Sequence, residues 1–122
     1  MKLMTKGIEK KFEKFPLYSQ DDRGKDSTVV VKYFNPYGIG TWLITEANKL
    51  DNGDWEMFGY CHLYEWEWGY VMLSELQGLR VPPFGKIFKD KYECQLYEDR
   101  LIGLGIERDL HIRENAKVKD LI

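Results

Sequence analysis

The stretch DWEMFGYCHLYEWEWGYVML, residues 54–73, concentrates aromatic side chains and decides how the fold is organised. Three of the four tryptophans and three tyrosines lie in it. Because it is too long for one ordinary strand, we predict two antiparallel strands that meet near Glu65. Both faces of the first strand are apolar or aromatic, which predicts a covered strand at the centre of the sheet. In the second strand, large side chains that share one face alternate with residues of the other face. The first set is Trp66, Trp68, Tyr70 and Met72, and the second is Glu65, Glu67 and Gly69.

Turn chemistry before this stretch predicts two more strands. Asp51-Asn52-Gly53-Asp54 contains an Asn-Gly pair, which tolerates the positive φ angles of a tight hairpin, so Lys49 or Leu50 is expected to pair with the residues after the turn. The β-branched run TVVVKYF (28–34) and the segment TWLITEA (41–47) are separated by NPYGIG. This composition predicts a further hairpin.

An amphipathic helix is predicted between Thr5, a suitable N-cap, and Pro16, which cannot continue a helix. Its apolar residues form one stripe: Met4, Ile8, Phe12 and Phe15. Lysines form a row on the other side, spaced by four: Lys2, Lys6, Lys10 and Lys14. We expect the apolar stripe to pack on the sheet. The basic row either contacts phosphates or an acidic partner, or is a solvated face whose lysines pair with Glu9 and Glu13.

These elements predict an α+β fold, in which an antiparallel sheet of four to five strands carries the N-terminal helix on one face. The 122 residues, 43% of them hydrophobic, are expected to form a single globular domain, 1–122. Ser74 can cap at most one helical turn before Gly78. Residues 84–104 are predicted as a short helix, with a hairpin as the alternative. IERDLHI (106–112) alternates like a short final strand, and the polar tail after it is expected to fray.

Composition narrows the class of protein. The net charge of −2 argues against a general nucleic-acid coat but leaves local charged patches open. Cys61 and Cys94 are the only cysteines, and without a secretory signal they are expected to be reduced. No stretch approaches the roughly 20 apolar residues of a membrane span. We therefore expect a cytoplasmic protein without a membrane association.

The final strand contains residues that could carry chemistry. Glu107, Asp109 and His111 are spaced by two and would share one face, where a carboxylate beside a histidine can act as a general base. The same spacing is typical of any exposed strand face. Arg108 would lie on the inner side with Ile106, where a buried charge needs a carboxylate partner, so we interpret Glu107-Arg108-Asp109 as a structural motif. No paired spacing of metal ligands occurs, and neither a metal nor a cofactor is expected.

The acidic aromatic stretch from Glu65 to Tyr70 is the second candidate. If the N-terminal helix covers its aromatic residues, they belong to the core. If Trp66 or Trp68 is exposed, stacking on bases or insertion into a groove of a partner becomes the leading alternative. Paired carboxylates near tryptophans also occur in sugar hydrolases, but a domain of this size offers no obvious deep cleft.

Several motifs follow one another in a fixed order: MKLMTKGIEKKF, FPLYSQDD, VVVKYFNP, Thr41-Trp42, FGY, WGYVMLSELQGL and GLGIERDLHI. This order resembles an uncharacterised family of small single-domain proteins carried by phages, plasmids and other mobile elements. The most specific pieces are residues 68–76 and 106–109, whereas the region 82–101 is longer than the family pattern. The resemblance implies no established activity. It does imply a context in which small proteins often inhibit host defence by binding a nuclease or its guide RNA.

We therefore expect a non-enzymatic binding protein, a monomer or small homo-oligomer, that inhibits an RNA-guided CRISPR nuclease or a restriction enzyme of a bacterial host cell. Two sets of binding residues are considered. Lysines of the helix would face nucleic acid: Lys6, Lys10, Lys11 and Lys14. The acidic aromatic set would face a basic channel of the nuclease: Glu65, Trp66, Glu67, Trp68 and Tyr70. Two alternatives stay open. One is a small hydrolase or nucleotide-processing enzyme that uses Glu107, Asp109 and His111, and the other is a small-ligand sponge with an aromatic pocket of Trp42, Trp66 and Tyr70.

Overall fold

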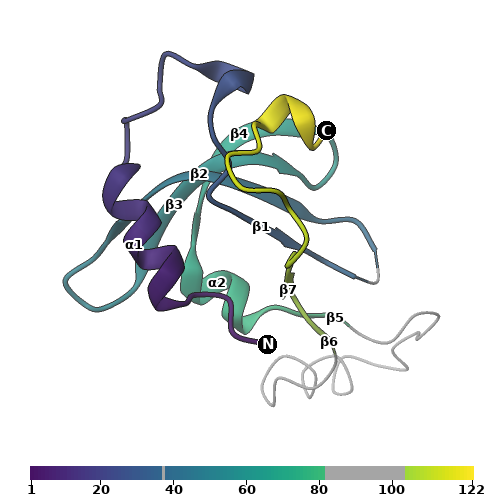
Figure 1. Cartoon of the computed structure of the whole chain (residues 1–122). Coiled ribbons are helices and arrows are strands. Elements are labelled where there is room, and N and C mark those ends of the chain that lie inside the picture. Colours follow the sequence, from purple (N-terminus) through teal and green to yellow (C-terminus); the bar gives the residue numbers. More distant parts are fainter. Residues whose placement is uncertain (37, 82–103) are drawn as a thin grey trace, which may run out of the picture.

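A computed structural model describes residues 1–36, 38–81 and 104–122 of the chain. Its main feature is a five-stranded antiparallel sheet in the order β4-β3-β2-β1-β7 (Figure 1). The strands of this sheet are β1 (Val31–Phe34), β2 (Thr41–Lys49), β3 (Trp55–His62), β4 (Trp66–Met72) and β7 (Glu107–Arg108). The helices are α1 (Lys6–Lys14) and α2 (Leu73–Gly78), with short 3-10 turns η1 (Gly24–Asp26) and η2 (Val118–Asp120). A separate two-stranded sheet joins β5 (Arg80–Val81) to β6 (Leu104–Gly105). The predicted α+β class is confirmed, whereas the prediction for 84–104 falls, except for Leu104, outside the described residues.

The hairpins follow the turn chemistry of the sequence. Lys49 pairs with Trp55 across the Asn-Gly turn, and Gly53 has a φ of 88°, the left-handed conformation that glycine adopts readily. His62 pairs with Trp66, so the two strands of the aromatic stretch meet around the predicted position. The expectation that β3 is the central strand was wrong. The centre is β2, because β7 pairs with the outer side of β1.

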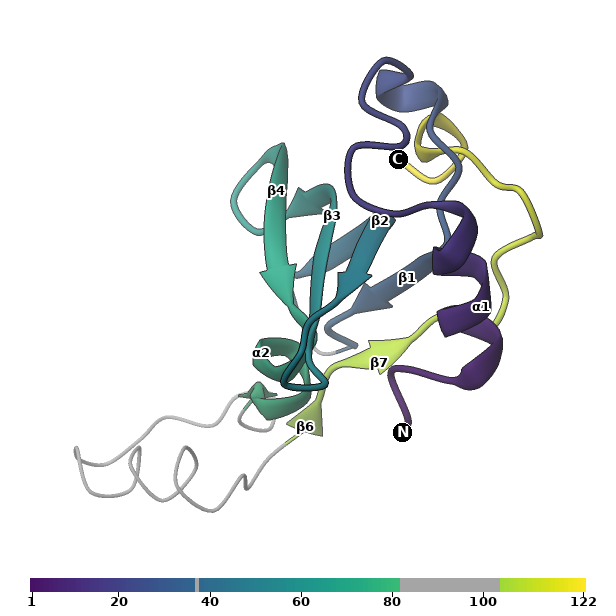
Figure 2. The ribbon, with the colours of Figure 1, turned by 90° about the vertical axis from the view of Figure 1, so that its left-hand side faces the viewer.

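Helix α1 packs on one face of the sheet, here called the helix face. The Thr5 hydroxyl accepts the N–H of Ile8 at 3.2 Å, which confirms the predicted N-cap. Ile8 and Phe12 are buried, and the Phe12 ring lies 5.7 Å from that of Trp55 between ring centroids. Figure 2 shows the helix on one side of the sheet, with β4 at the far edge. The main core therefore lies between α1 and the strands.

The C-terminal segment packs on the sheet, and the expectation of a frayed tail was wrong. Ala116 and Val118 are fully buried. The N–H of Val118 donates to the Ser27 carbonyl at 3.1 Å, and the N–H of Val29 donates to the Ala116 carbonyl at 2.8 Å. Val118 packs with Val29 and Leu43 on the side opposite α1. Burial of a few apolar residues is thus enough to hold a segment that is polar on average.

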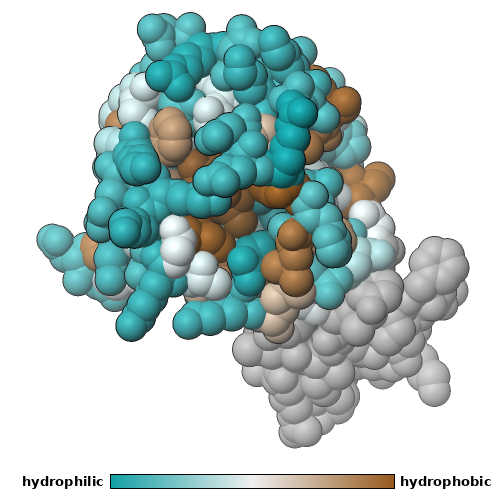
Figure 3. All heavy atoms as spheres, viewed as in Figure 1, coloured by the Kyte–Doolittle hydropathy of each residue, from teal (hydrophilic) through white to brown (hydrophobic). Residues whose placement is uncertain are grey.

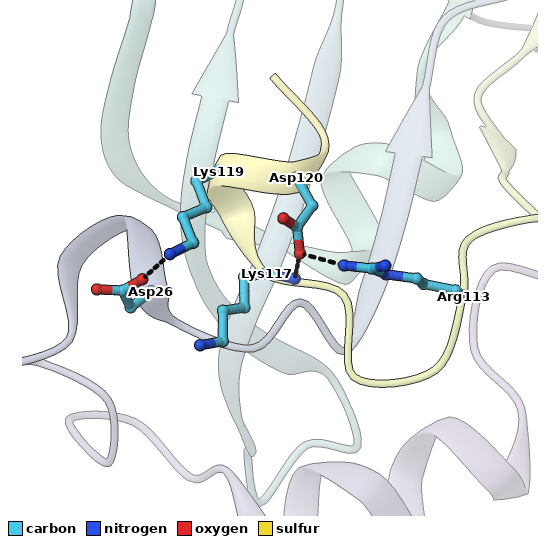
Figure 4. A network of polar contacts seen from close by, with 5 residues as sticks. All are labelled: Asp26, Arg113, Lys117, Lys119 and Asp120. Atoms are coloured by element: carbon cyan, nitrogen blue, oxygen red, sulfur yellow. Dashed lines mark hydrogen bonds and ion pairs between the residues drawn. The ribbon is translucent and has the colours of Figure 1, made fainter.

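One ion pair joins this segment to the loop around η1, and a second lies within the segment (Figure 4). Lys119 Nζ lies 2.7 Å from Asp26 Oδ1, and Arg113 Nη2 lies 2.7 Å from Asp120 Oδ2. The hydrogen bond and positive charge of Lys119 hold the pKa of Asp26 below its ordinary value. The C-terminal segment is therefore tied to the loop around η1 by one ion pair and braced internally by the other.

Two local elements differ from their predicted lengths. Strand β7 covers only Glu107–Arg108, because the Asp109 carboxylate accepts the N–H of His111 at 2.8 Å and turns the chain away from the sheet. Leu110 is consequently 59% exposed rather than on an inner face. Helix α2 is longer than one turn, and Ser74 does not cap it. The Ser74 hydroxyl instead donates to Asp54 Oδ2 at 2.5 Å.

Candidate binding surface

The side of the sheet opposite α1 carries a ladder of rings, here called the aromatic face. Its members are Phe58, Tyr60 and His62 of β3 with Trp66, Trp68 and Tyr70 of β4. The register places these side chains together, because it pairs Phe58 with Tyr70, Tyr60 with Trp68 and His62 with Trp66. Rings also stack diagonally, with centroids 5.6 Å apart for Phe58 and Trp68 and 5.2 Å apart for Tyr60 and Trp66. Helix α1 does not cover this ladder, and Trp68 is 37% and Tyr70 55% exposed.

The acidic residues of the predicted binding stretch do not share this face. Glu67 pairs with Cys61 in the register and therefore projects to the helix face. Burial, with the negative charge of Glu67 as a second cause, raises the pKa of the Cys61 thiol to about 12. Glu65 is exposed in the turn before β4. The predicted set is therefore divided between a turn and two faces.

The aromatic pocket expected for a ligand sponge is not formed. Trp42 is buried and belongs to the core of the helix face, together with Cys61. Trp66 and Tyr70 lie on the other side of the sheet. The reason is the strict alternation of side chains along each strand, which separates these residues by the thickness of the sheet.

A cavity of about 260 Å³ lies where the loop 16–27 passes over the edge of the aromatic face. Its lining includes Gln20, Asp21, Glu46, Phe58 and Trp68. The loop contributes polar groups and the two strands contribute rings. This cavity therefore combines aromatic rings with carboxylates. It was not predicted from the sequence.

Glu46 is the buried charge at this cavity and is 2% exposed. A register shift between Ile44 and Glu46 places it opposite Phe58, on the side away from α1. Its Oε2 accepts the N–H of Gln20 at 2.6 Å and its Oε1 accepts the N–H of Tyr18 at 3.0 Å. Two backbone hydrogen bonds thus fix the carboxylate and hold the loop on β2. A lone acid within the apolar strand TWLITEA was the pattern that could have revealed this role.

Gln20 completes the attachment of the loop. Its side-chain nitrogen donates to the carbonyls of Thr45 at 2.7 Å and Thr28 at 3.0 Å, and its side-chain oxygen accepts the N–H of Thr28 at 2.7 Å. The loop therefore bridges β2 and the segment just before β1. Such satisfied, buried hydrogen bonds give the cavity a fixed wall.

Charges of both signs surround the aromatic face. Lys25 Nζ lies 5.6 Å from the centre of the Tyr60 ring, a cation–π contact. A hydrogen bond with Tyr18 raises the pKa of Tyr70, and the charges of Asp21 and Glu56 add to the effect. Two carboxylates, those of Asp21 and Glu56, therefore lie near the Tyr70 end of the face.

The lysines of α1 lie on the outer side of the helix, away from the aromatic face. Lys6, Lys10, Lys11 and Lys14 are all exposed. Within the parts of the chain that the structure describes, Glu9 and Glu13 form no ion pair with them. Figure 3 shows this side of the molecule as mostly hydrophilic, with hydrophobic patches between the polar side chains. The lysine row is therefore an exposed basic surface, and whether it binds a partner stays a prediction.

Glu107, Asp109 and His111 border a depression of about 350 Å³ next to β7. The Asp109 carboxylate is already engaged, since Oδ2 lies 3.4 Å from Lys32 Nζ and Oδ1 accepts the backbone N–H of His111. Arg108 is half-buried, and its Nε donates to the Lys2 carbonyl at 3.2 Å; no carboxylate among the described residues forms an ion pair with it. Arg108 thus clamps the N-terminal segment. Among residues 1–36, 38–81 and 104–122, no group of three potential metal ligands occurs.

The fold and its surface define a class: a small α+β protein whose sheet is covered by a helix on one face and presents aromatic rings on the other. The chain belongs to the family described as Protein of unknown function (DUF2958), whose model matches residues 3–96. The match includes the loop 16–27 and the aromatic face, but ends before β7 and the C-terminal segment. Residues 106–109, on which the resemblance partly rested, therefore lie outside it. No curated protein and no solved structure matches the chain. None of the described helices is long and apolar enough to cross a membrane.

Proposed function

We propose that this is a non-enzymatic binding protein of a phage or other mobile element, and that it inhibits a host defence nuclease by covering a basic surface of that enzyme. The observation that carries the proposal is the exposure of Trp68 and Tyr70, 37% and 55%, on a face that α1 leaves uncovered. Tryptophan and tyrosine are the residues that most often contribute large binding energies at protein interfaces. Rings held on a sheet also lose little conformational entropy when a partner binds.

The arrangement of charge favours the aromatic face over the lysine row as the contact surface. The two surfaces lie on opposite sides of the sheet, so one compact partner contacts one of them. Lysine is depleted at interfaces, whereas exposed tryptophan and tyrosine are enriched there. Asp21 and Glu56 supply negative charge next to Tyr70, which complements the basic channel of a nuclease.

The order of motifs described above supports the context of a mobile element, and membership of an uncharacterised family is compatible with it. An inhibitor that acts by binding needs no chemistry of its own, which fits a protein proposed to be non-enzymatic. In this proposal the guide RNA is not contacted directly. The helix lysines act at most by steering, a long-range effect that salt weakens.

Affinity capture followed by a cleavage assay tests the proposal. The tagged protein is captured from cells that carry the mobile element, and half of each sample is treated with nuclease to remove RNA-bridged partners. The captured host nuclease is then assayed for DNA cleavage with added protein. We expect capture to resist the treatment and cleavage to be inhibited.

Matched variants locate the surface. Trp68→Ala is expected to weaken inhibition about 30-fold, the equivalent of about 2 kcal/mol at an interface hot spot. Tyr64→Ala removes a ring that is 99% exposed in the preceding turn and serves as the control. Reversal of Lys6, Lys10 and Lys14 to glutamate is expected to leave inhibition largely intact at physiological salt. Failure to capture any defence nuclease, or loss of inhibition only in the lysine variant, contradicts the proposal.

A further inference from the structure

The cavity beside the aromatic face has the lining of a site for a cation. Phe58 and Trp68 form its apolar wall, and Asp21 and Glu46 contribute carboxylates. No arginine, lysine or histidine among the described residues lines it. At about 260 Å³, it has room for the head and part of the stem of one long side chain.

Glu46 supplies acceptors that are fixed before any ligand arrives. Each of its carboxylate oxygens accepts one backbone N–H, from Tyr18 and from Gln20. A carboxylate has about four acceptor positions, so positions remain for a second donor on each oxygen. Because Glu46 is buried, an interaction with an incoming cation is screened less than it would be in water.

The rings add a surface that attracts cations. Phe58 and Trp68 stack with an angle of 10° between their planes and 5.6 Å between their centroids, so one face of each ring is turned toward the other and the outer face is the one that a cation could bind. The faces of aromatic rings carry negative potential and bind cations over them. Lys25 already illustrates this chemistry, since its ammonium group lies over the neighbouring Tyr60 ring of the same aromatic face.

We infer that this cavity receives the guanidinium group of an arginine side chain from the protein partner. The inference rests on the proposed function, because the partner surface in that proposal is basic. Arginine suits the site better than lysine, because its planar group stacks on rings, is more weakly hydrated and donates several hydrogen bonds to a carboxylate. A nucleotide base could stack on the same wall, but the phosphate attached to it would meet Asp21 and Glu46 with like charge.

The test uses the full chain, labelled with ¹⁵N, and small probes in place of the partner. N-acetylarginine amide is titrated while the indole N–H of Trp68 and the backbone N–H of Gln20 are followed by NMR. The matched neutral probe is N-acetylcitrulline amide, and AMP represents a nucleotide ligand. We expect saturable shifts with a millimolar Kd for the arginine probe and at least tenfold weaker binding of the other two.

Variants assign the shifts to the cavity. Asp21→Asn and Trp68→Ala are each expected to weaken binding of the arginine probe at least fivefold. Asp22→Asn, a change at the adjacent exposed acid, and Tyr64→Ala are the matched controls and should bind as the unaltered protein does. Backbone spectra of all variants report whether the fold is retained.

Several outcomes overturn the inference. Equal binding of the arginine and citrulline probes removes the role of charge, and unaltered binding by Trp68→Ala removes the cavity. Tighter binding of AMP than of the arginine probe assigns the site to a nucleotide instead. Because the titration needs no partner, its failure leaves nuclease capture through Trp68 untouched. Conversely, failed capture would end the proposed function without changing the titration result.

Discussion

Replacement of Gly59 by alanine should be among the most damaging single changes in the sheet. Gly59 lies in the middle of β3, where it pairs with Ile44 of β2 and with Gly69 of β4. A Cβ atom built on Gly59 would lie 2.0 Å from the Leu43 carbonyl oxygen and 2.8 Å from the Ile44 Cα. Both neighbours are backbone atoms, so no side-chain rotation can relieve the contact.

The size of the effect follows from these distances. Real Cβ contacts are essentially never shorter than 3.0 Å, so β2 and β3 must move apart locally by about 1 Å. A backbone hydrogen bond of ~2.9 Å would lengthen to ~3.9 Å and be lost. Two or three lost bonds at about 1 kcal/mol each, with an overpacking cost of about 1–3 kcal/mol, give roughly 3–6 kcal/mol. This is a large part of the 5–15 kcal/mol that is typical of the free energy of unfolding of a domain.

Gly69→Ala is the matched control, because Gly69 is the partner of Gly59 in the same register. A Cβ on Gly69 would meet no atom within 4 Å. Alanine there should leave stability unchanged or raise it by about 0.5 kcal/mol, since it restricts the unfolded chain. Urea unfolding followed by tryptophan fluorescence measures both variants. With an m-value of about 2 kcal/mol per molar, Gly59→Ala should lower the midpoint by about 2 M or abolish folding.

A loss of less than about 1 kcal/mol in the free energy of unfolding of Gly59→Ala, at an unchanged m-value, would contradict the prediction. A Gly69→Ala variant that is destabilised as strongly as Gly59→Ala would also contradict the prediction, because contact of the new Cβ with the β2 backbone would then not be the cause.

Three further predictions concern the attachment of segments to the sheet. Glu46→Gln replaces one of two acceptor oxygens by an amide donor that faces a backbone N–H. We expect the free energy of unfolding, measured in urea, to fall by about 2 kcal/mol. The control is Asn48→Ala, which removes an exposed hydrogen bond to the same loop and should cost less than about 1 kcal/mol. Val118→Ala should cost about 1.5–2.5 kcal/mol, because the side chain is fully buried, whereas a disordered tail would show no change. Hydrogen bonds lower the pKa of Asp54, that from the Ser74 hydroxyl most and that from the Trp55 N–H next. The contribution of the Asp54 carboxylate to the free energy of unfolding should therefore be present above about pH 4 and lost as the pH falls further. The difference in stability between the unaltered protein and Asp54→Asn should therefore vanish in acid, and a difference that grows as the pH falls would contradict this assignment.

Short-range patterns were sufficient for most of the fold. The Asn-Gly turn fixed the pairing of Lys49 with Trp55, and Thr5 with Pro16 bounded the first helix. These features depend on residues within a few positions of one another, where sequence and conformation are directly linked. The period of two in β4 also predicted correctly that Trp66, Trp68 and Tyr70 share a face.

Long-range packing could not be predicted in the same way. The register shift at Ile44 and Glu46 depends on the loop 16–27, whose backbone N–H groups supply the partners of the carboxylate. The C-terminal segment is ordered because Val118 meets Val29, a contact between residues far apart in the chain. The acid within TWLITEA marks Glu46 as unusual, but no local pattern gives its partners or the contact of Val118 with Val29. The predicted binding residues were only partly correct for a different reason. Glu67 was grouped with Trp66 and Trp68 because they are neighbours in the sequence, although alternation along β4 places Glu67 on the other face of the sheet.

The ring ladder has a structural role as well as the proposed binding role, and the two can be separated. Cross-strand stacking on Phe58 and Tyr60 stabilises the β3–β4 hairpin, at roughly 0.2–1 kcal/mol per pair. Stacking explains why large rings occupy β4, but it uses only the side of each ring that faces β3. The outward parts of Trp68 and Tyr70 contribute nothing to that packing, and polar residues there would avoid exposed apolar area. Retention of large, uncovered rings on a strand at the edge of the described sheet is therefore better explained by a partner that covers them than by the stability of the hairpin.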